Sequence, residues 1–459
     1  MKSAASPAWT PVDRQLDVFL TAFDPSDLPG ASVDPLGFER GYLFLADKVL
    51  PGLTNAANRP RYLSVLCAGA YLAESQDGSP RAQYEKRLDC VLRFERFWAL
   101  ANVLASREGG EDKWPSAGVR GVTYAMPKAE TLVAKQLSRT NADFKLLSRQ
   151  TPYGVVGLYA AVADGLHLID RATMDVSLGM GLGENLAKSF LDETQAPTEL
   201  RRAVREDGDV SVRDLTAWGA RAHIADTYGM EEARCLKEAS RLDDTRSRML
   251  RILAEFPNVG EDRGELDRLD RIAKALESKA GHADLREAIC GILAYEKCSR
   301  LVQLGLERLL WVCRTAQSAD IAWAELGTDS VLDRVRESLP AAVKRLGGLL
   351  DAPTTEPFSK DLNRLADTRQ FLELAASSRD VGALVQATLD RHRDVQRGKF
   401  DRGRRKLPWL EVNGGRLNLT MTRVGGLNYE ATTPDDVAPH PYRLASADAF
   451  NEASSRVRR

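Results

Sequence analysis

The longest uninterrupted helical pattern in the chain runs from Leu285 to about Gln317. Apolar residues recur there every three or four positions: Ile289, Ile292, Leu293, Leu301, Leu304, Leu306, Leu309, Leu310 and Val312. This spacing places an apolar stripe along one helix face, which must be buried against other helices. We therefore expect a mainly α fold, built as a multi-helix assembly.

The same periodicity predicts further helices, and only one segment alternates clearly like a strand pair. The predicted helices lie near residues 36–50, 61–74, 81–107, 129–138, 153–168, 212–223, 230–256, 265–278, 331–350, 361–376, 381–396 and 446–455. Residues 407–412 and 416–420 alternate, with Asn413-Gly414-Gly415 between them. Such a turn predicts a short C-terminal β-hairpin.

The length of 459 residues predicts about two to four domains. Residues 1–35 are rich in proline and predict a flexible lead-in with one short helix near 13–23. Residues 36–145 are expected to form an N-terminal helical domain, and residues 206–397 a second one. Residues 146–205 fit a winged-helix-like module, or equally a plain helical bundle carrying a loop. Residues 398–459 would hold a basic segment, the hairpin and a terminal helix.

The charge total is balanced, with 64 Lys and Arg against 65 Asp and Glu. This composition is typical of a globular protein and excludes a disordered or disulfide-framework chain. The six cysteines contain no Cys-x-x-Cys pair, and no stretch reaches 18 apolar residues. The N-terminal residues lack the pattern of a signal peptide. We therefore expect a reduced, cytoplasmic protein without a membrane segment.

No complete catalytic or cofactor motif is present. The run Gly179-Met180-Gly181-Leu182-Gly183 precedes Lys188-Ser189, but Ala187 stands where a phosphate-binding loop has glycine. Glu111-x-Lys113 is only half of a nuclease-type metal site, and the five histidines share no metal-ligand spacing. The sequence predicts no cofactor and no metal, and it favours a non-catalytic role while leaving catalysis open.

The clearest local deviation is electrostatic. Between Arg391 and Lys406, eight basic residues face only Asp394 and Asp401, so eight minus two leaves six positive charges. Clustered arginines beside an aromatic ring suit phosphate contacts and base stacking. The predicted nucleic-acid or partner-binding residues are Arg397, Lys399, Arg402, Arg404, Arg405, Lys406 and Trp409. The alternative is a solvated basic linker that pairs with acidic helices.

A second basic group lies at the start of the helix near residue 61. Arg59, Arg61 and Tyr62 could bind an anion or an acidic partner there. The alternative, which we favour, is that the two arginines bond to backbone carbonyls of the preceding turn.

Several short patches together resemble uncharacterised bacterial proteins associated with phage-defence loci. The first is Leu50-Pro51-Gly52-Leu53-Thr54 with Arg59, Arg61 and Tyr62. The others are Gly183 with Leu186-Ala187 and Phe190; Glu232-Ala233 with Leu236, Arg246 and Leu250; and Pro408-Trp409. The resemblance implies a component of a defence system and carries no reaction.

The preferred interpretation is a non-catalytic component of a bacterial antiphage defence assembly that contacts DNA or a partner protein through its Arg-rich C-terminal segment. Its expected partners are other defence-system proteins and DNA, with no membrane contact. One alternative is a metal-dependent nuclease whose ligands lie far apart in sequence. The other is a structural adaptor that binds only protein.

Overall fold

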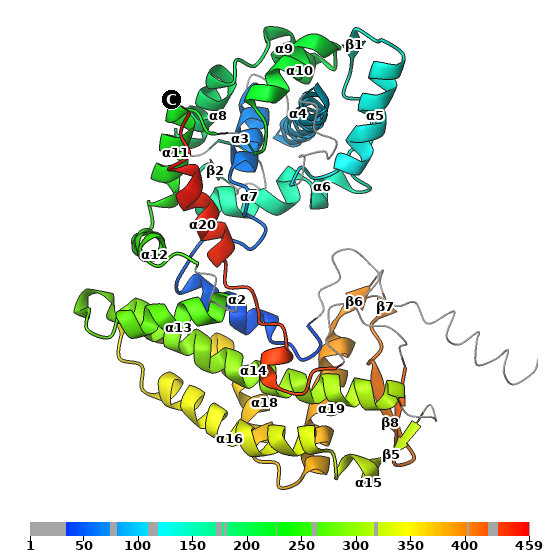
Figure 1. Ribbon diagram of the computed structural model, residues 1–459, viewed down its shortest axis with the longest axis vertical. Helices are drawn as coiled ribbons and strands as arrows, with labels where there is room; N and C mark the ends of the chain where they lie inside the picture. Colours follow the sequence, from blue (N-terminus) through cyan, green and yellow to red (C-terminus); the bar gives the residue numbers. More distant parts are fainter. Residues whose placement is uncertain are drawn as a thin grey trace, which may run out of the picture. The chain divides into compact units, whose positions relative to one another are not determined.

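A computed structural model describes residues 34–73, 80–108, 118–170, 177–178, 181–225, 227–258, 264–315, 320–401, 404–420 and 430–458. The fold is mainly helical with a few short strands, which confirms the predicted class (Figure 1). No helix within these ranges is long and apolar enough to cross a bilayer. The helix expected near residues 13–23 lies outside the described residues.

The chain divides into two compact units, each built from separate stretches of sequence. Unit 1 combines the residues up to Lys48 with residues 262–440. Unit 2 combines residues 49–261 with those from Pro441 onward. The sequence had predicted consecutive domains with limits at 145, 205 and 397, so the observed division differs. The physical reason is that α2 (Glu39–Asp47) packs on a helix more than 200 positions later in the sequence. Likewise the last helix, α20 (Leu444–Ala453), packs on α11 (Met230–Ser240) and α12 (Asp244–Glu255).

Unit 2 is a helical assembly centred on α3 (Arg61–Ala73), in which every residue except Tyr71 is buried. Its neighbours are α4 (Pro80–Glu108), α7 (Val155–Gly165) and α8 (Leu182–Glu193). The remaining helices are α5 (Val122–Ala134), α6 (Gln150–Tyr153), α9 (Thr198–Glu206), α10 (Val212–Arg221), α11 (Met230–Ser240), α12 (Asp244–Glu255) and α20 (Leu444–Ala453). Two small antiparallel pairs join β1 (Arg139–Thr140) to β4 (Val210–Ser211) and β2 (Ile169–Asp170) to β3 (Ser177–Leu178).

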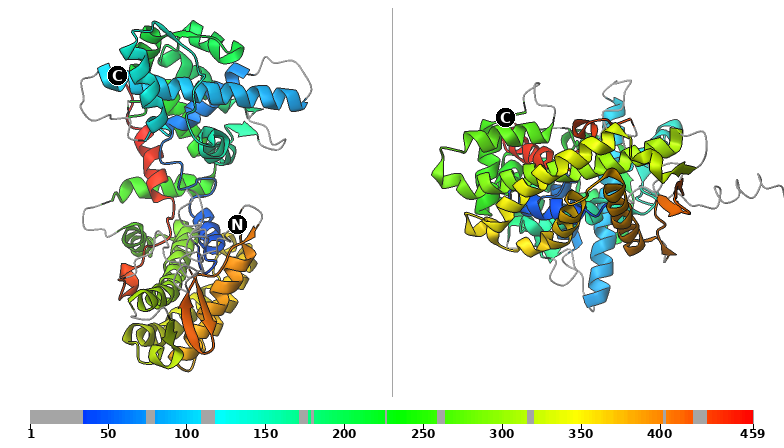
Figure 2. Two further views of the ribbon diagram at one scale, coloured as in Figure 1. Left: turned by 90° about the vertical axis from the view of Figure 1, so that its right-hand side faces the viewer. Right: turned by 90° about the horizontal axis from the view of Figure 1, so that it is seen from below.

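Unit 1 is organised around α14 (Ala283–Thr315), the helix that carries the longest apolar stripe. Helices α2 (Glu39–Asp47), α13 (Glu265–Ala275), α16 (Ser330–Asp351) and α19 (Val381–Gly398) pack against it (Figure 2). The other helical elements of unit 1 are η2 (Ala280–His282), α15 (Trp323–Leu326), α17 (Glu356–Ser359), η3 (Leu362–Leu365), α18 (Ala366–Ala376) and η4 (Pro434–Asp436). The predicted helix 285–317 is therefore confirmed almost to its ends.

The predicted hairpin is present and belongs to a three-stranded antiparallel sheet in unit 1. Strand β8 (Leu410–Asn413) pairs with β9 (Arg416–Leu419), and β9 also pairs with β5 (Asp320–Ala322). Both turn glycines, Gly414 and Gly415, have positive φ values of 59° and 74°, which glycine adopts without steric cost. Strand β9 is thus central, and β5 and β8 are the two edges.

Two local expectations change in unit 2. Residues 146–205 contain the β2–β3 pair between α7 and α8, but α8 packs on α3 and α11 inside the unit. The segment is therefore part of the unit 2 core, with the β2–β3 pair between two of its helices. The single helix predicted over 230–256 is two helices, because Asp243 accepts the N–H of Arg246 and begins α12.

The contact between α10 and α4 is close enough to depend on a glycine. A Cβ added to Gly219 would lie 2.0 Å from the carbonyl oxygen of Ala101 on α4. We expect Gly219→Ala to lower the free energy of unfolding by about 2 kcal/mol or more, because the two backbones must separate.

Gly348 in α16 provides the matched control. It has no described atom within 4 Å of an added Cβ, so Gly348→Ala should raise stability by about 0.5–1 kcal/mol. Urea unfolding followed by circular dichroism measures both variants. Equal effects of the two substitutions would contradict the close approach of α10 and α4.

Candidate functional site

The Arg-rich segment begins on α19 and continues into a short antiparallel pair. Strand β6 (Phe400–Asp401) pairs with β7 (Arg404–Arg405), and the backbone N–H of Lys406 donates to the carbonyl of Lys399. We call residues 399–406 the basic ribbon. Arg402 lies outside the described residues, and only the backbone of Arg404 is described.

Three of the predicted binding cations present charge at the surface. Arg397 and Arg405 are exposed, and Lys406 is half-buried. Within the described part of the chain, Arg397 and Lys406 form no ion pair. The side chains of Arg397 and Lys406 are therefore available for contact with an anion, and Arg405 adds exposed positive charge beside them.

Other basic residues of the segment serve the fold. Three of them donate hydrogen bonds to the backbone carbonyls of residues 34–36. Arg391 donates to Leu36 at 2.8 Å, His392 donates to Pro35 at 3.0 Å, and Lys399, the residue after α19, donates to Asp34. Burial lowers the pKa of Lys399. The predicted binding residue Lys399 is therefore an internal anchor, and it attaches the basic ribbon to the chain that leads into α2.

His392 and Trp409 complete this attachment. The Nε2 atom of His392 accepts the backbone N–H of Trp409 at 2.8 Å, so its proton belongs on Nδ1, which donates to Pro35. Burial lowers the pKa of His392 to about 4. The Trp409 side chain is only 5% exposed, with its ring centroid 4.9 Å from that of His392. The expectation that Trp409 stacks on bases is corrected, because its ring lies inside unit 1.

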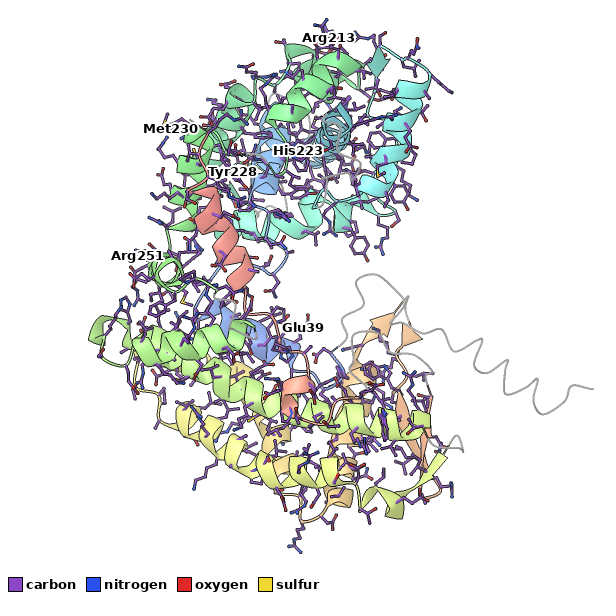
Figure 3. All side chains as sticks on the ribbon, viewed as in Figure 1. Glu39, Arg213, His223, Tyr228, Met230 and Arg251 are labelled. Atoms are coloured by element: carbon purple, nitrogen blue, oxygen red, sulfur yellow. The ribbon has the colours of Figure 1, made fainter. Side chains whose placement is uncertain are left out.

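The second predicted group separates into one surface residue and two core residues. Arg59 is exposed, whereas Arg61 and Tyr62 are 0% and 1% exposed. Arg61 lies 3.4 Å from Glu232 and donates to the carbonyl of Thr227 at 2.9 Å. Its guanidinium also stands 4.3 Å from the ring centroid of Tyr228, which is labelled in Figure 3. Arg61 and Tyr62 thus cannot reach an external anion in this fold.

Glu232 is the buried counterpart of Arg61. Its Oε1 atom accepts the hydroxyl of Ser64 at 2.6 Å, and burial raises its pKa. Desolvation disfavours the charged carboxylate, while Arg61 and Ser64 oppose that effect. The pair holds α3 to α11 through buried polar contacts.

The patches that carry the resemblance converge inside unit 2. Arg246 donates to the carbonyls of Pro51 and Ser240, each at 2.7 Å. Arg61 joins the first patch to Glu232, and its guanidinium lies 5.8 Å from the ring centroid of Phe190. Pro408-Trp409 belongs to unit 1. Most of the resembling residues therefore maintain the core of unit 2.

The motifs of catalytic or phosphate-binding type do not form a site among the described residues. Helix α8 begins after Gly181, and Lys188 pairs with Glu184 one turn before it at 2.5 Å. Glu111 and Lys113 lie outside the described ranges. Of the described His, Cys, Asp and Glu side chains, no three are grouped so as to hold a metal ion.

A groove of about 830 Å³ lies in unit 1, between α13, α14, α16 and η4. Its polar lining is largely paired within the unit. Glu296 accepts the N–H and Nδ1 of His440, both at 3.0 Å, and Arg300 lies 3.3 Å from Asp435. The arrangement shows no preference for one class of ligand.

Sequence reasoning missed His392, the residue that fixes the basic ribbon. A lone histidine on a helix gives no local signal, because one of its partners, Pro35, is 357 positions away and the other, Trp409, lies beyond the end of the helix. Comparisons of the chain with protein-family models, with curated proteins and with solved structures returned no match.

Proposed function

We propose that the protein is a non-catalytic, cytoplasmic component of a bacterial antiphage defence assembly that binds duplex DNA through the basic ribbon and Arg397. The observation that carries the DNA contact is the anchoring of a strongly basic segment by buried and partly buried hydrogen bonds to residues 34–36. An anchored segment presents its charges with less loss of conformational freedom than a free linker would. The defence context rests on the resemblance alone.

The chemistry favours phosphate contacts over base recognition. Arg397, Arg405 and Lys406 offer positive charge, but the ring of Trp409, which was expected to stack on bases, is buried. Arginine and lysine contacts to phosphates position a protein on DNA without reading the sequence. We therefore expect binding with little sequence preference and a strong dependence on salt.

The test replaces Arg397, Arg405 and Lys406 together by alanine. Each lost phosphate contact should reduce the salt slope by about 0.9, so the triple variant should lose about 2.7 in total. Fluorescence anisotropy with a labelled duplex at several salt concentrations measures the slope.

The matched control replaces Lys344, Arg345 and Lys360, three exposed cations elsewhere in unit 1. It changes the net charge by the same amount and should keep the wild-type slope. An unchanged slope in the ribbon variant, or an equal loss in the control, rejects the proposed DNA contact.

A further inference from the structure

We propose that the side chain of Leu407 inserts between adjacent base pairs of bound DNA, so that the protein prefers a duplex whose bases are easily unstacked. This proposal rests on the DNA contact proposed above and names the form of DNA that the basic ribbon would select. Leucine is one of the apolar side chains that proteins insert as wedges, which partly unstack a base step and kink the duplex.

Leu407 directly follows the basic ribbon and is 66% exposed. Exposed leucines that stand alone on a surface are common and need no explanation. Leu407 differs from them in its position, because it adjoins the residues 391–406 that carry six net positive charges. Phosphate contacts by these cations would bring Leu407 against the duplex.

The side chain of Leu407 shares a face of the chain with Arg405. A residue before proline is held in an extended conformation, and side chains two positions apart on an extended chain point to the same side. The burial follows this alternation, because Arg405 and Leu407 are exposed whereas Lys406 is half-buried and Pro408 is buried. Leu407 therefore points the same way as one of the cations that we expect to contact phosphate.

The backbone on both sides of Leu407 is held by hydrogen bonds. The N–H of Lys406 donates to the carbonyl of Lys399 at 3.0 Å, and the N–H of Trp409 donates to His392 at 2.8 Å. A backbone that is already fixed lowers the conformational cost of placing a side chain in the base stack. Leu407 is thus presented to the duplex in a defined position.

Insertion of Leu407 makes binding depend on how firmly the bases are stacked. Unstacking a base step costs free energy in a fully paired duplex and costs less at a mismatched pair. Phosphate contacts alone do not distinguish the two, since both duplexes carry the same backbone charge. A wedge therefore predicts tighter binding to mismatched DNA.

The first test uses the full chain and two labelled duplexes of equal length, one fully paired and one with a single central mismatch. Fluorescence anisotropy should show about tenfold tighter binding of the mismatched duplex. Equal affinity for the two, with the salt slope expected of the ribbon, would overturn the wedge and leave the DNA contact intact. Absence of binding to either duplex would reject the DNA contact and the wedge together.

The second test changes the protein. Leu407→Ala shortens the wedge without altering the charge, so the affinities for the two duplexes should become equal while the salt slope stays at the wild-type value. The matched control is Leu374→Ala, which shortens a leucine of α18 that is 61% exposed in the same unit and should keep the preference. A preference that survives in Leu407→Ala, or one that is lost in both variants, would reject insertion of Leu407.

Discussion

Replacing Arg61 by alanine is expected to lower the free energy of unfolding by about 3–5 kcal/mol, the largest effect of any substitution considered for this chain. Arg61 and Glu232 are both fully buried, so the variant leaves the Glu232 carboxylate in the core without its cation. It also removes the hydrogen bond to Thr227 and the contact with the Tyr228 ring. Urea or thermal unfolding of the variant measures the loss.

Arg59 is the matched control because it has the same side chain two positions earlier and is exposed. Arg59→Ala should change stability by no more than about 0.5 kcal/mol. Glu232→Ala should be costly on its own, while the Arg61→Ala, Glu232→Ala double variant should lose less than the sum of the two. Additive losses would mean that the two side chains do not act as a pair.

Acidification is expected to weaken unit 1 through His392. The pKa of His392 is lowered from its ordinary 6.5 to about 4 in the folded protein, because burial disfavours the imidazolium. The stabilising contribution is complete above pH 6.5, where His392 is neutral in both states. It is lost as pH falls from 6.5 to about 4, since only the unfolded chain takes up the proton. The difference of 2.5 pKa units corresponds to about 3 kcal/mol.

The measurement compares unfolding of the wild type and His392→Gln across this pH range. Carboxylate titrations are common to both proteins, so the difference between the two curves reports His392. We expect the difference in free energy of unfolding between the two proteins to shrink as the pH falls toward 4. DNA binding by the basic ribbon should weaken over the same range, because protonated His392 can no longer accept the N–H of Trp409. Parallel curves would show that the neutral imidazole does not stabilise unit 1.

The bounds of a helix were predictable where an apolar stripe ends at residues that stop a helix, such as glycine, proline or a polar cluster. The predicted range 81–107 differs from α4 by one residue at each end, and 285–317 nearly matches α14. The break between α11 and α12 was missed because the apolar period continues through it, although Asp243 offers a capping side chain. Strand β5 was also missed, because its pairing with β9 joins residues almost 100 positions apart.

Partners far apart in sequence also limited the prediction of the site. Nothing in the local sequence distinguishes Arg59 from Arg61. Arg61 is buried beside Glu232, which lies more than 160 positions later, whereas Arg59 is exposed. Trp409 directly follows a basic run, which is the position expected of a base-stacking residue. In the fold its backbone N–H donates to His392 and its ring is buried. Local composition located the basic ribbon, whereas the division of its residues into buried anchors and exposed cations required the fold.

The interleaving of the two units has a consequence for synthesis on the ribosome. Residues 49–261 of unit 2 emerge early, but its helix α20 follows all of residues 262–440. Asn451 of α20 donates to the carbonyl of Leu250, and Ser446 donates to the carbonyl of Thr54. Residues 49–261 therefore cannot form these contacts until α20 has been synthesised. In a nascent chain the α20-binding surface of unit 2 therefore stays uncovered until residues 262–440 have been translated.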